Sequence, residues 1–325
     1  MMRILVTGGA GFIGSHVADR FMDAGHAVAV LDDLSNGRRE NVPAGAVFHE
    51  MDVRSPDAAA LVGGGGFDVI AHFAAQMDVR RSVADPVFDA QVNILGTLNL
   101  LEAVRAAGRM GTTRFVFAST GGAIYGDSAP PPNVETVRKE PDSPYAVAKH
   151  TAEQYLSYYA RIHGLNAVAM RFANVYGPRQ DPHGEAGVVA IFCGRLLAGQ
   201  PLTVFGDGNQ TRDYVYVGDV AASIVRGAQH TPPKSAGMDA RAFNIGTGVP
   251  TSVVDLASAM MRAVGRTVPI EFAAARPGEQ RQSYLNIDKA AAELGWRPSV
   301  SLAQGLAETY AWFAKRSPTS IDSRA

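Results

Sequence analysis

The chain of 325 residues can form one large or two medium domains, and its formal net charge of −1 excludes a global field that would attract nucleic acid or anionic membranes. The single cysteine, Cys193, follows an apolar run, so we expect it in the core. No apolar run approaches the ~20 residues that span a bilayer, and the first strand starts too early to leave room for a signal peptide. We therefore expect a cytoplasmic protein with no membrane partner, no nucleic-acid partner and no metal site.

Strand-like and helical segments alternate through the first half of the chain. Apolar runs of strand length occupy residues 3–7, 27–31, 46–51, 68–73, 114–118 and 167–171. Helices are expected near 85–107 and 143–163, and the second has Asp142 before it and Pro144 in its first turn as start signals. This alternation predicts an α/β fold with a doubly wound parallel sheet of the Rossmann type and helices on both faces.

Beyond about Val175, Gly and Pro divide the chain into shorter segments. This change predicts a smaller C-terminal α/β domain that contributes the substrate side of a cleft. We assign residues 1–175 to the sheet domain and 176–317 mainly to the substrate domain, some of whose elements return to the first sheet. The polar residues 318–325 are expected to form a frayed tail.

A glycine-rich turn follows the first strand. Gly8, Gly11 and Gly14 come directly after Thr7, and a helical segment starts behind them. Small residues at such a turn let a pyrophosphate reach the backbone amides, while the positive end of the helix dipole faces the phosphates. The pattern therefore predicts a dinucleotide-binding loop.

Two carboxylates, Asp32 and Asp33, end the second strand. A carboxylate there can accept hydrogen bonds from the adenosine ribose hydroxyls and would repel a 2′-phosphate, so NAD is favoured over NADP. Arg38 and Arg39 follow a few residues later and could hold a 2′-phosphate, which leaves this preference open.

Tyr145 and Lys149 are four residues apart in the helix predicted near 143–163. Residues at this spacing share one helical face, so the ammonium group lies beside the phenol. A nearby lysine and an oxidised nicotinamide ring both favour the phenolate and lower the tyrosine pKa from its usual value near ~10. The pair therefore predicts redox chemistry at an alcohol. Ser119 and Thr120, at the end of the fifth apolar run, are expected beside the cofactor.

These motifs resemble those of the extended short-chain dehydrogenases/reductases. Over nearly its whole length the chain is similar to the group of NAD-dependent epimerases and dehydratases, and within it to the UDP-glucose 4-epimerases. Besides the glycine turn, the matching segments are 72–76, 82–86, 93–97, 171–179, 205–208, 212–215 and 276–279.

The resemblance implies which residues surround a bound NAD and a UDP-sugar. The catalytic residues would be Tyr145, Lys149, Thr120 and Ser119. Those at the cofactor would be Gly8, Gly11, Phe12, Ile13, Gly14, Asp32, Asp33, Asn36, Gly37, Asp52, Val53, Phe73, Ala74, Ala75, Asn93, Ser119, Tyr145 and Lys149. Those at the substrate would be Thr120, Tyr145, Asn174, Val188, Phe205, Arg212, Tyr214, Arg276, Glu279 and Ser283.

The resemblance also implies the reaction, the interconversion of UDP-glucose and UDP-galactose through a 4-keto sugar. Tyr145 would remove the proton of the 4-hydroxyl while hydride passes to NAD. The keto sugar would turn over while Arg212, Arg276 and Asn174 hold its diphosphate. NAD would be regenerated within each turnover and stay bound.

One position departs from the family pattern. Many members place a Ser or Thr four residues before the tyrosine of a Tyr-Gly pair, which here begins at Tyr125, and that position is Gly121. We therefore assign the active-site hydroxyl to Thr120, with Ser119 as the alternative. The related 4,6-dehydratases carry Asp-Glu after their threonine, whereas Thr120 is followed by Gly121 and Gly122, which argues against dehydratase activity.

The sequence leaves the substrate and the reaction class open. A UDP-glucuronate 4-epimerase or decarboxylase of the same family is one alternative. A non-catalytic NAD-binding regulator is another, although such proteins usually lack the Tyr-Lys pair. Ser283, four residues beyond Glu279, stands where hexose-restricted epimerases have a tyrosine. We therefore expect UDP-N-acetylglucosamine and UDP-N-acetylgalactosamine to be accepted as well.

The oligomeric state is indicated by the resemblance alone. Family members usually dimerise through two helices of each subunit, which here are those near 85–107 and 143–163. We expect a homodimer on this basis, although the sheet could equally cover the apolar faces of these helices.

Overall fold

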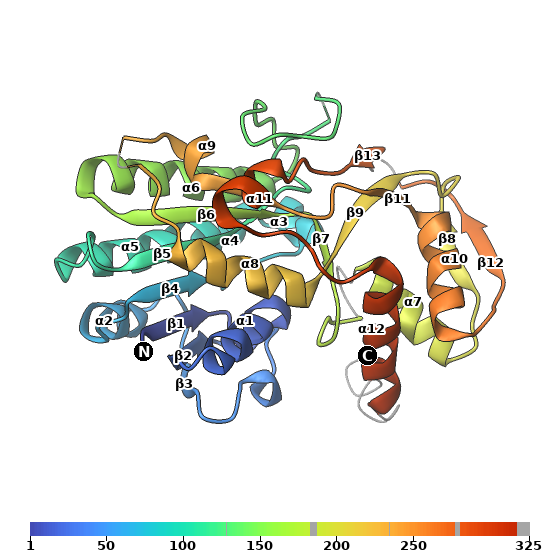
Figure 1. The fold of residues 1–325 in the computed structure, drawn as a ribbon, viewed down its shortest axis with the longest axis horizontal. Coiled ribbons are helices and arrows are strands. Elements are labelled where there is room, and N and C mark those ends of the chain that lie inside the picture. The colour runs from blue at the N-terminus through green and yellow to red at the C-terminus, as the bar shows by residue number, and fades with distance from the viewer. Residues whose placement is uncertain (128, 183–186, 234, 277–279, 317–325) are drawn as a thin grey trace.

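The computed structural model describes residues 1–127, 129–182, 187–233, 235–276 and 280–316. Figure 1 shows a larger lobe built on one sheet and a smaller lobe beside it. The main sheet confirms the predicted fold class, because all seven of its strands run parallel. From one edge to the other they are β3 (Val47–Glu50), β2 (Ala27–Asp32), β1 (Arg3–Thr7), β4 (Val69–His72), β5 (Arg114–Thr120), β6 (Asn166–Phe172) and β10 (Ala242–Ile245).

The first six strands are those predicted from the apolar runs, in the order of doubly wound folds. The last, β10, comes from the second half of the chain and pairs with β6. It was not predicted, because Gly and Pro divide this half of the chain into short segments, and the segment is a strand through its pairing with the distant β6. The domain boundary after residue 175 stays a prediction, and the tail at 318–325 lies outside the described residues.

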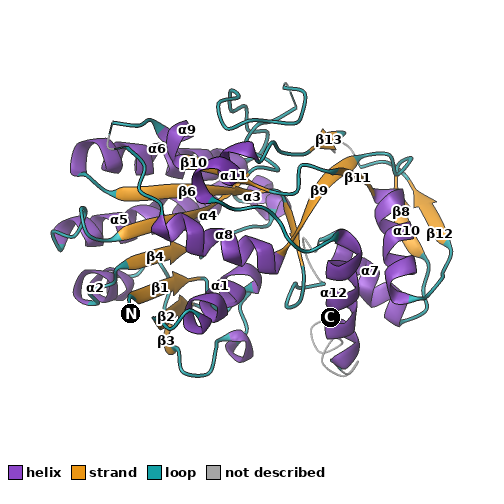
Figure 2. Ribbon diagram, in the orientation of Figure 1, coloured by secondary structure: helices purple, strands orange, loops and turns teal. Residues whose placement is uncertain are grey.

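Helices cover both faces of this sheet (Figure 2). Alternate residues of β1 point to different cores: Ile4 and Val6 pack in one, and Leu5 packs in the other. The first core includes residues of α1 (Phe12–Asp23), α8 (Val217–Gln229) and α11 (Asp288–Leu294). The second includes residues of α2 (Pro56–Gly64), α5 (Gly96–Ala106) and α6 (Pro144–His163). Burial on both faces explains why the strands are apolar without alternation.

The predicted helix 85–107 is divided. It consists of α4 (Pro86–Ala90), the π-helical turn η2 (Gln91–Leu95) and α5. In η2 the side chain of Asn93 donates a hydrogen bond to the carbonyl oxygen of Gln76 at 2.9 Å, and its backbone carbonyl oxygen accepts one from the Thr97 hydroxyl at 2.7 Å. Such contacts depend on tertiary structure, so the apolar pattern could not show them. π-helical turns are frequent at functional sites.

The smaller lobe is built around β9 (Thr211–Tyr216). Its neighbours in the sheet are β7 (Asn174–Tyr176), β11 (Pro250–Ser252) and β13 (Gln282–Ser283), and a separate parallel pair is formed by β8 (Leu202–Phe205) and β12 (Ile270–Ala273). These strands pack with α7 (Val188–Leu197), α10 (Val253–Val264) and α12 (Leu302–Lys315) on a third core. Cys193 is buried there, as predicted.

Three short elements complete the described secondary structure: η1 (Arg39–Asn41), α3 (Val79–Ala84) and α9 (Met238–Arg241). Within the part of the chain that the structure describes, none of the helices has the length and apolar character needed to cross a membrane. Because β7 follows β6 after one residue, the smaller lobe begins at the carboxyl edge of the main sheet.

Candidate active site

The glycine turn is packed too tightly to accept larger residues. Gly8 has a φ of +68°, and a Cβ atom there would lie 2.5 Å from the amide nitrogen of Ala74. A Cβ atom at Gly14 would lie 2.2 Å from the carbonyl oxygen of Gly8. The turn therefore closes directly onto the N-terminus of α1, with Gly11 and Phe12 at its start. This arrangement fits the pyrophosphate of a dinucleotide.

Asp32 ties this turn to the end of β2. One carboxylate oxygen accepts a hydrogen bond from the Ala10 amide at 2.9 Å, and the other accepts one from the Leu34 amide at 2.9 Å. Burial raises the pKa of Asp32, while the amide bonds act in the opposite direction. The loop requires glycine at position 37, because a Cβ atom added there would lie 2.6 Å from Asp32 Oδ1. Asp32 thus shapes the loop in addition to its predicted role at the ribose, and Asp33 beside it is exposed.

Five further predicted cofactor residues follow β3 and β4: Asp52, Val53, Phe73, Ala74 and Ala75. Val53 is buried, whereas Asp52 is engaged by Arg54, whose Nη2 atom lies 2.5 Å from Asp52 Oδ2. The side-chain hydrogen bonds from Arg54 lower the pKa of Asp52. Phe73 stacks on Phe172 of β6 with ring centroids 6.2 Å apart. These residues border the same edge of the sheet as the glycine turn, because all the strands are parallel.

Tyr145 and Lys149 occupy the first turns of α6, which begins where the sequence predicted. The Ser143 hydroxyl caps the helix by accepting a hydrogen bond from the Ala146 amide at 3.2 Å. Lys149 is buried, and its Nζ atom donates to the carbonyl oxygen of Ala118 in β5 at 3.0 Å. The same Nζ atom lies 5.9 Å from the centroid of the Tyr145 ring. The helix thus holds an ammonium and a phenol together at the end of β5.

Burial dominates the electrostatics of this pair. It lowers the pKa of Lys149 to about 8, against the opposing effects of Asp89 and Glu153. Burial also raises the pKa of Tyr145, and Asp89 adds to that rise. We expected Lys149 to lower the tyrosine pKa, and the protein by itself does not show this lowering. The positive nicotinamide ring is the other group that we expected to favour the phenolate.

The two hydroxyls at the end of β5 have different environments. Ser119 is buried, and its Oγ atom donates to Glu153 Oε1 at 2.6 Å. Thr120 is partly exposed at the end of the strand. Ser119 is thus engaged in the interior, and Thr120 is the more accessible of the two hydroxyls. This difference supports the first of the two assignments made from the sequence.

Gly121 explains why the hydroxyl is displaced from its usual family position. A Cβ atom at this residue would lie 2.6 Å from a methyl carbon of Leu285 and 3.0 Å from the carbonyl oxygen of Arg171. Its amide also donates to the carbonyl oxygen of Phe172 at 2.7 Å. A Ser or Thr at 121 would have to displace these groups, so this position does not accept the hydroxyl residue of the family pattern without rearrangement.

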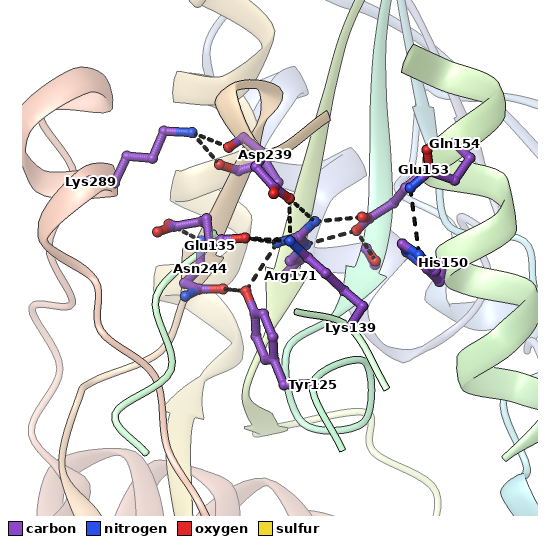
Figure 3. A network of polar contacts seen from close by, with 12 residues as sticks. Tyr125, Glu135, Lys139, His150, Glu153, Gln154, Arg171, Asp239, Asn244 and Lys289 are labelled. Carbon is purple, nitrogen blue, oxygen red and sulfur yellow. Dashed lines mark hydrogen bonds and ion pairs between the residues drawn. The ribbon is translucent and has the colours of Figure 1, made fainter. Parts of the chain in front are cut away.

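A buried ion pair anchors α6 (Figure 3). Arg171 in β6 and Glu153 in α6 are fully buried and joined by two hydrogen bonds, of 2.7 Å from Nη2 and 3.0 Å from Nε. Arg171 also donates to the Tyr125 hydroxyl at 3.1 Å, which in turn donates to Asn244 in β10 at 2.6 Å. The sequence patterns did not reveal this network. Glu153 lies one helical turn beyond Lys149, and this spacing was the feature of the sequence that could have indicated that Glu153 faces the same side of the helix.

Several of the predicted substrate residues lie in the smaller lobe, on strands, in a helix and in a loop. Arg212 in β9 stands beside Ser283 of β13 in the strand register. The guanidinium carbon of Arg276 lies 3.9 Å from the centroid of the Phe205 ring. Val188 begins α7, and Glu279 lies outside the described residues.

Asn174 connects this lobe to the catalytic side. It begins β7 and stands beside Tyr214 of β9 in the register. A Cβ atom at Gly122 would lie 3.8 Å from Asn174 Oδ1, so the start of β7 adjoins the turn that follows Thr120. The structure therefore places Asn174 at the carboxyl edge of the main sheet, beside the turn that follows Thr120.

The sequence as a whole matches a family that fits this geometry. The model of the NAD dependent epimerase/dehydratase family matches residues 4–246. The chain belongs to this family. Membership confirms the group predicted from the motifs and the NAD cofactor.

Individual family members are similar over nearly their whole length. The UDP-glucose 4-epimerase of Mycolicibacterium smegmatis is 46% identical, over 97% of this chain and 100% of that protein. The structure of the Thermotoga maritima UDP-glucose 4-epimerase with UDP-glucose has a TM-score of 0.90 at 43% identity, covering 97% of this chain and 99% of that one. The Thermus thermophilus UDP-glucose 4-epimerase in complex with NAD gives 0.87 at 44% identity, covering 97% and 100%.

Replacing Gly14 by Ala should weaken NAD binding. Ala stabilises a helix by ~1 kcal/mol over Gly, but here its Cβ atom would lie 2.2 Å from the Gly8 carbonyl oxygen and force the turn open. Overpacking of this kind costs about 1–3 kcal/mol, or roughly 10- to 100-fold in affinity. The measurement is the NAD released per chain when the purified protein is denatured.

Gly194→Ala is the matched control, because Gly194 also lies inside a helix and an added Cβ atom would meet nothing within 4 Å. It should keep the NAD content of the unmodified protein. Equal NAD content in the two variants would contradict the role given to the turn.

Proposed function

We propose that this protein is a UDP-glucose 4-epimerase with tightly bound NAD, which interconverts UDP-glucose and UDP-galactose. The observation that carries the proposal is the Tyr145–Lys149 pair, held at the end of β5 beside Thr120 and at the same edge of the sheet as the glycine turn. Similar proteins of this name cover nearly the whole chain. Location in the cytoplasm stays a prediction from the sequence.

The residues of α6 and β5 divide the proton chemistry among them. Bound NAD supplies the acceptor for the hydride of the carbinol and its donor in the second half of the turnover. Tyr145 takes the proton of the 4-hydroxyl and later returns it to the 4-keto oxygen, acting first as base and then as acid. Lys149 stabilises the phenolate that is present before the first of these steps and again after the second. Thr120 hydrogen-bonds the reacting oxygen and fixes its position against Tyr145.

Epimerisation also requires that the keto sugar present its other face without leaving. Arg212 and Arg276 hold the diphosphate, since guanidinium groups match phosphate oxygens. Arg276 rests on the Phe205 ring through a cation–π contact, which uses none of its N–H donors. Asn174 reaches the same diphosphate from the start of β7. The sugar can therefore rotate while the nucleotide stays fixed.

Replacing Tyr145 by Phe should lower the rate of isomer formation from UDP-glucose by ~10²–10⁴-fold, because the phenol is the proton acceptor. Bound NAD should remain, since the ring is kept. The assay follows isomers of UDP-glucose and of UDP-glucuronate without added NAD, which also tests the alternative UDP-glucuronate 4-epimerase or decarboxylase.

Tyr155→Phe provides the control, because Tyr155 lies on the same helix with 38% of its surface exposed. It should keep the full rate. An unchanged rate in Tyr145→Phe would remove the catalytic assignment. Absence of turnover in the unmodified protein, with NAD still bound, would favour the non-catalytic regulator.

We further propose that N-acetylated UDP-hexoses are substrates. Ser283 is buried in β13 next to Arg212, where hexose-restricted relatives have a tyrosine. A small residue there leaves room for a 2-acetamido group. Ser283→Tyr should therefore reduce turnover of UDP-N-acetylglucosamine by roughly 10- to 100-fold through a steric clash, and largely spare UDP-glucose.

Ser283→Ala keeps the space and should turn over both sugars. The comparison is the ratio of kcat/KM for UDP-N-acetylglucosamine and UDP-glucose in the three proteins. If the unmodified protein converts UDP-galactose but neither N-acetylated sugar, the proposal of a wide pocket is wrong.

We also propose a homodimer formed through α4, η2 and α6, which pack against one another. Their outer faces carry apolar side chains that the sheet does not cover. The exposed ones on these elements and on α3 are Val79, Val83, Val87, Leu95, Val147, Tyr155, Tyr158 and Ile162. Exposed apolar side chains gathered on neighbouring elements are typical of protein–protein contacts.

Val87→Glu should weaken the dimer by at least about tenfold, because a buried valine contributes roughly 1.5–3 kcal/mol and the new charge would be desolvated. Light scattering after size-exclusion chromatography at several concentrations measures the change. Val47→Glu, in which an equally exposed valine of β3 is replaced, should have no effect. An unmodified protein that is monomeric at micromolar concentration would contradict the proposal.

A further inference from the structure

A second group of buried polar side chains lies where α4 and η2 pack against α6. Asp89 in α4 is 1% exposed, and its Oδ1 atom accepts hydrogen bonds from Gln76 Nε2 at 2.9 Å and Asn93 Nδ2 at 3.0 Å. Its second oxygen, Oδ2, is buried and has no hydrogen-bond partner among the described residues, and the same holds for Asn93 Oδ1. The proposed catalytic steps do not use this group.

A carboxylate in this position destabilises the fold unless a positive charge offsets it. Burying a charge costs several kcal/mol, and half of the hydrogen-bonding capacity of Asp89 is unused. The buried cation on the facing helix is Lys149, which contacts a neutral carbonyl oxygen, that of Ala118, at 3.0 Å. Asp89 and Lys149 are thus two buried opposite charges on helices that pack against each other, and each is held by neutral groups.

We propose that Asp89 is a positioning residue of the active site: its buried carboxylate is the counter-charge of Lys149 across the α4–α6 contact, and it holds both Tyr145 and Lys149 toward their protonated forms. This inference rests on the roles proposed for Tyr145 and Lys149. The electrostatic effects agree with it, because Asp89 raises the pKa of Lys149 against the larger effect of burial, and raises that of Tyr145 in addition to burial.

The other titratable groups near Tyr145 and Lys149 are paired with other residues, neutral or exposed. Glu153 on α6 is bound in two places by Arg171. His72 on β4 is fully buried, and burial lowers its pKa to about 3, so it is neutral at physiological pH. The other charged groups on α4 and on α3, which packs against it, are exposed; they are Arg80, Arg81 and Asp85. Asp89 is therefore the carboxylate that acts on the pair without a contact cation of its own.

The sign of the effect is fixed by the charges. A negative charge favours the ammonium of Lys149 and disfavours the phenolate of Tyr145, so it raises the pKa of both groups. Removing that charge must lower both. The acid limb of kcat/KM, where Tyr145 gains its proton, and the alkaline limb, where Lys149 loses its proton, should then move to lower pH together.

Asp89→Asn tests this directly, because the amide keeps one acceptor oxygen and loses the charge. With NAD bound, the phenolate absorbance of Tyr145, taken as the difference between each protein and its Tyr145→Phe counterpart, should appear about one pH unit lower. Both limbs of the kcat/KM profile should shift in the same direction. Asp89→Glu keeps the charge and should keep the positions of both limbs, even if its rate falls.

Asp85→Asn is the matched control: it removes one negative charge from the exposed cap of the same helix, and Asn caps a helix as well as Asp does. Its profile should stay in place. A lower rate in Asp89→Asn with unshifted limbs and unshifted phenolate absorbance would reduce Asp89 to a structural residue and overturn the proposal. If Asp89→Asn does not fold, Asp89→Ser gives the same test.

The two proposals can fail separately. Full turnover by Tyr145→Phe would end the catalytic assignment of Tyr145, while the absorbance titration would still show whether Asp89 controls its protonation. Conversely, loss of activity in Tyr145→Phe together with an unshifted titration in Asp89→Asn would leave the epimerase proposal intact and remove the role of Asp89.

Discussion

The ion pair between Arg171 and Glu153 decides where α6 lies, and the candidate site depends on that position. Removing one partner of such a buried pair costs about 3–5 kcal/mol, because the other charge remains in the interior. The paired guanidinium and carboxylate groups therefore leave the helix little freedom to rotate. One turn earlier, Lys149 reaches the end of β5, and the same carboxylate engages Ser119, which leaves Thr120 for the substrate.

Parallel strands gather the rest of the site at a single edge. The glycine turn follows β1, Asp32 ends β2, Phe73 follows β4 and Thr120 ends β5. β7 then leads from the same edge into the smaller lobe. Of the residues proposed to hold the diphosphate, Asn174 begins β7, Arg212 lies on β9 and Arg276 follows β12. A ligand that spans both lobes can thus be oxidised at one end and anchored at the other.

Local patterns were sufficient for part of this arrangement. The glycine turn, the end of β2 and the Tyr145–Lys149 spacing are fixed by residues close in sequence, so periodicity and turn chemistry reveal them. The π-helical turn at Asn93, the engagement of Ser119 by Glu153 and the position of Asp89 depend on partners distant in sequence or on neighbouring elements. A pattern of residue types does not specify such partners, and the opposite effect of burial on Tyr145 was missed for the same reason.

The position of β10 late in the sequence has a consequence for folding during synthesis. β6 is an interior strand because Ala242–Ile245 pairs with it, yet these residues leave the ribosome about 70 residues after β6 itself. During that interval the nascent sheet has an open, apolar border at β6, which is the kind of surface that recruits other chains. Completion of the sheet is thus coupled to translation of the first part of the smaller lobe, β7 to β9, and a nascent chain released before β10 would retain the open border.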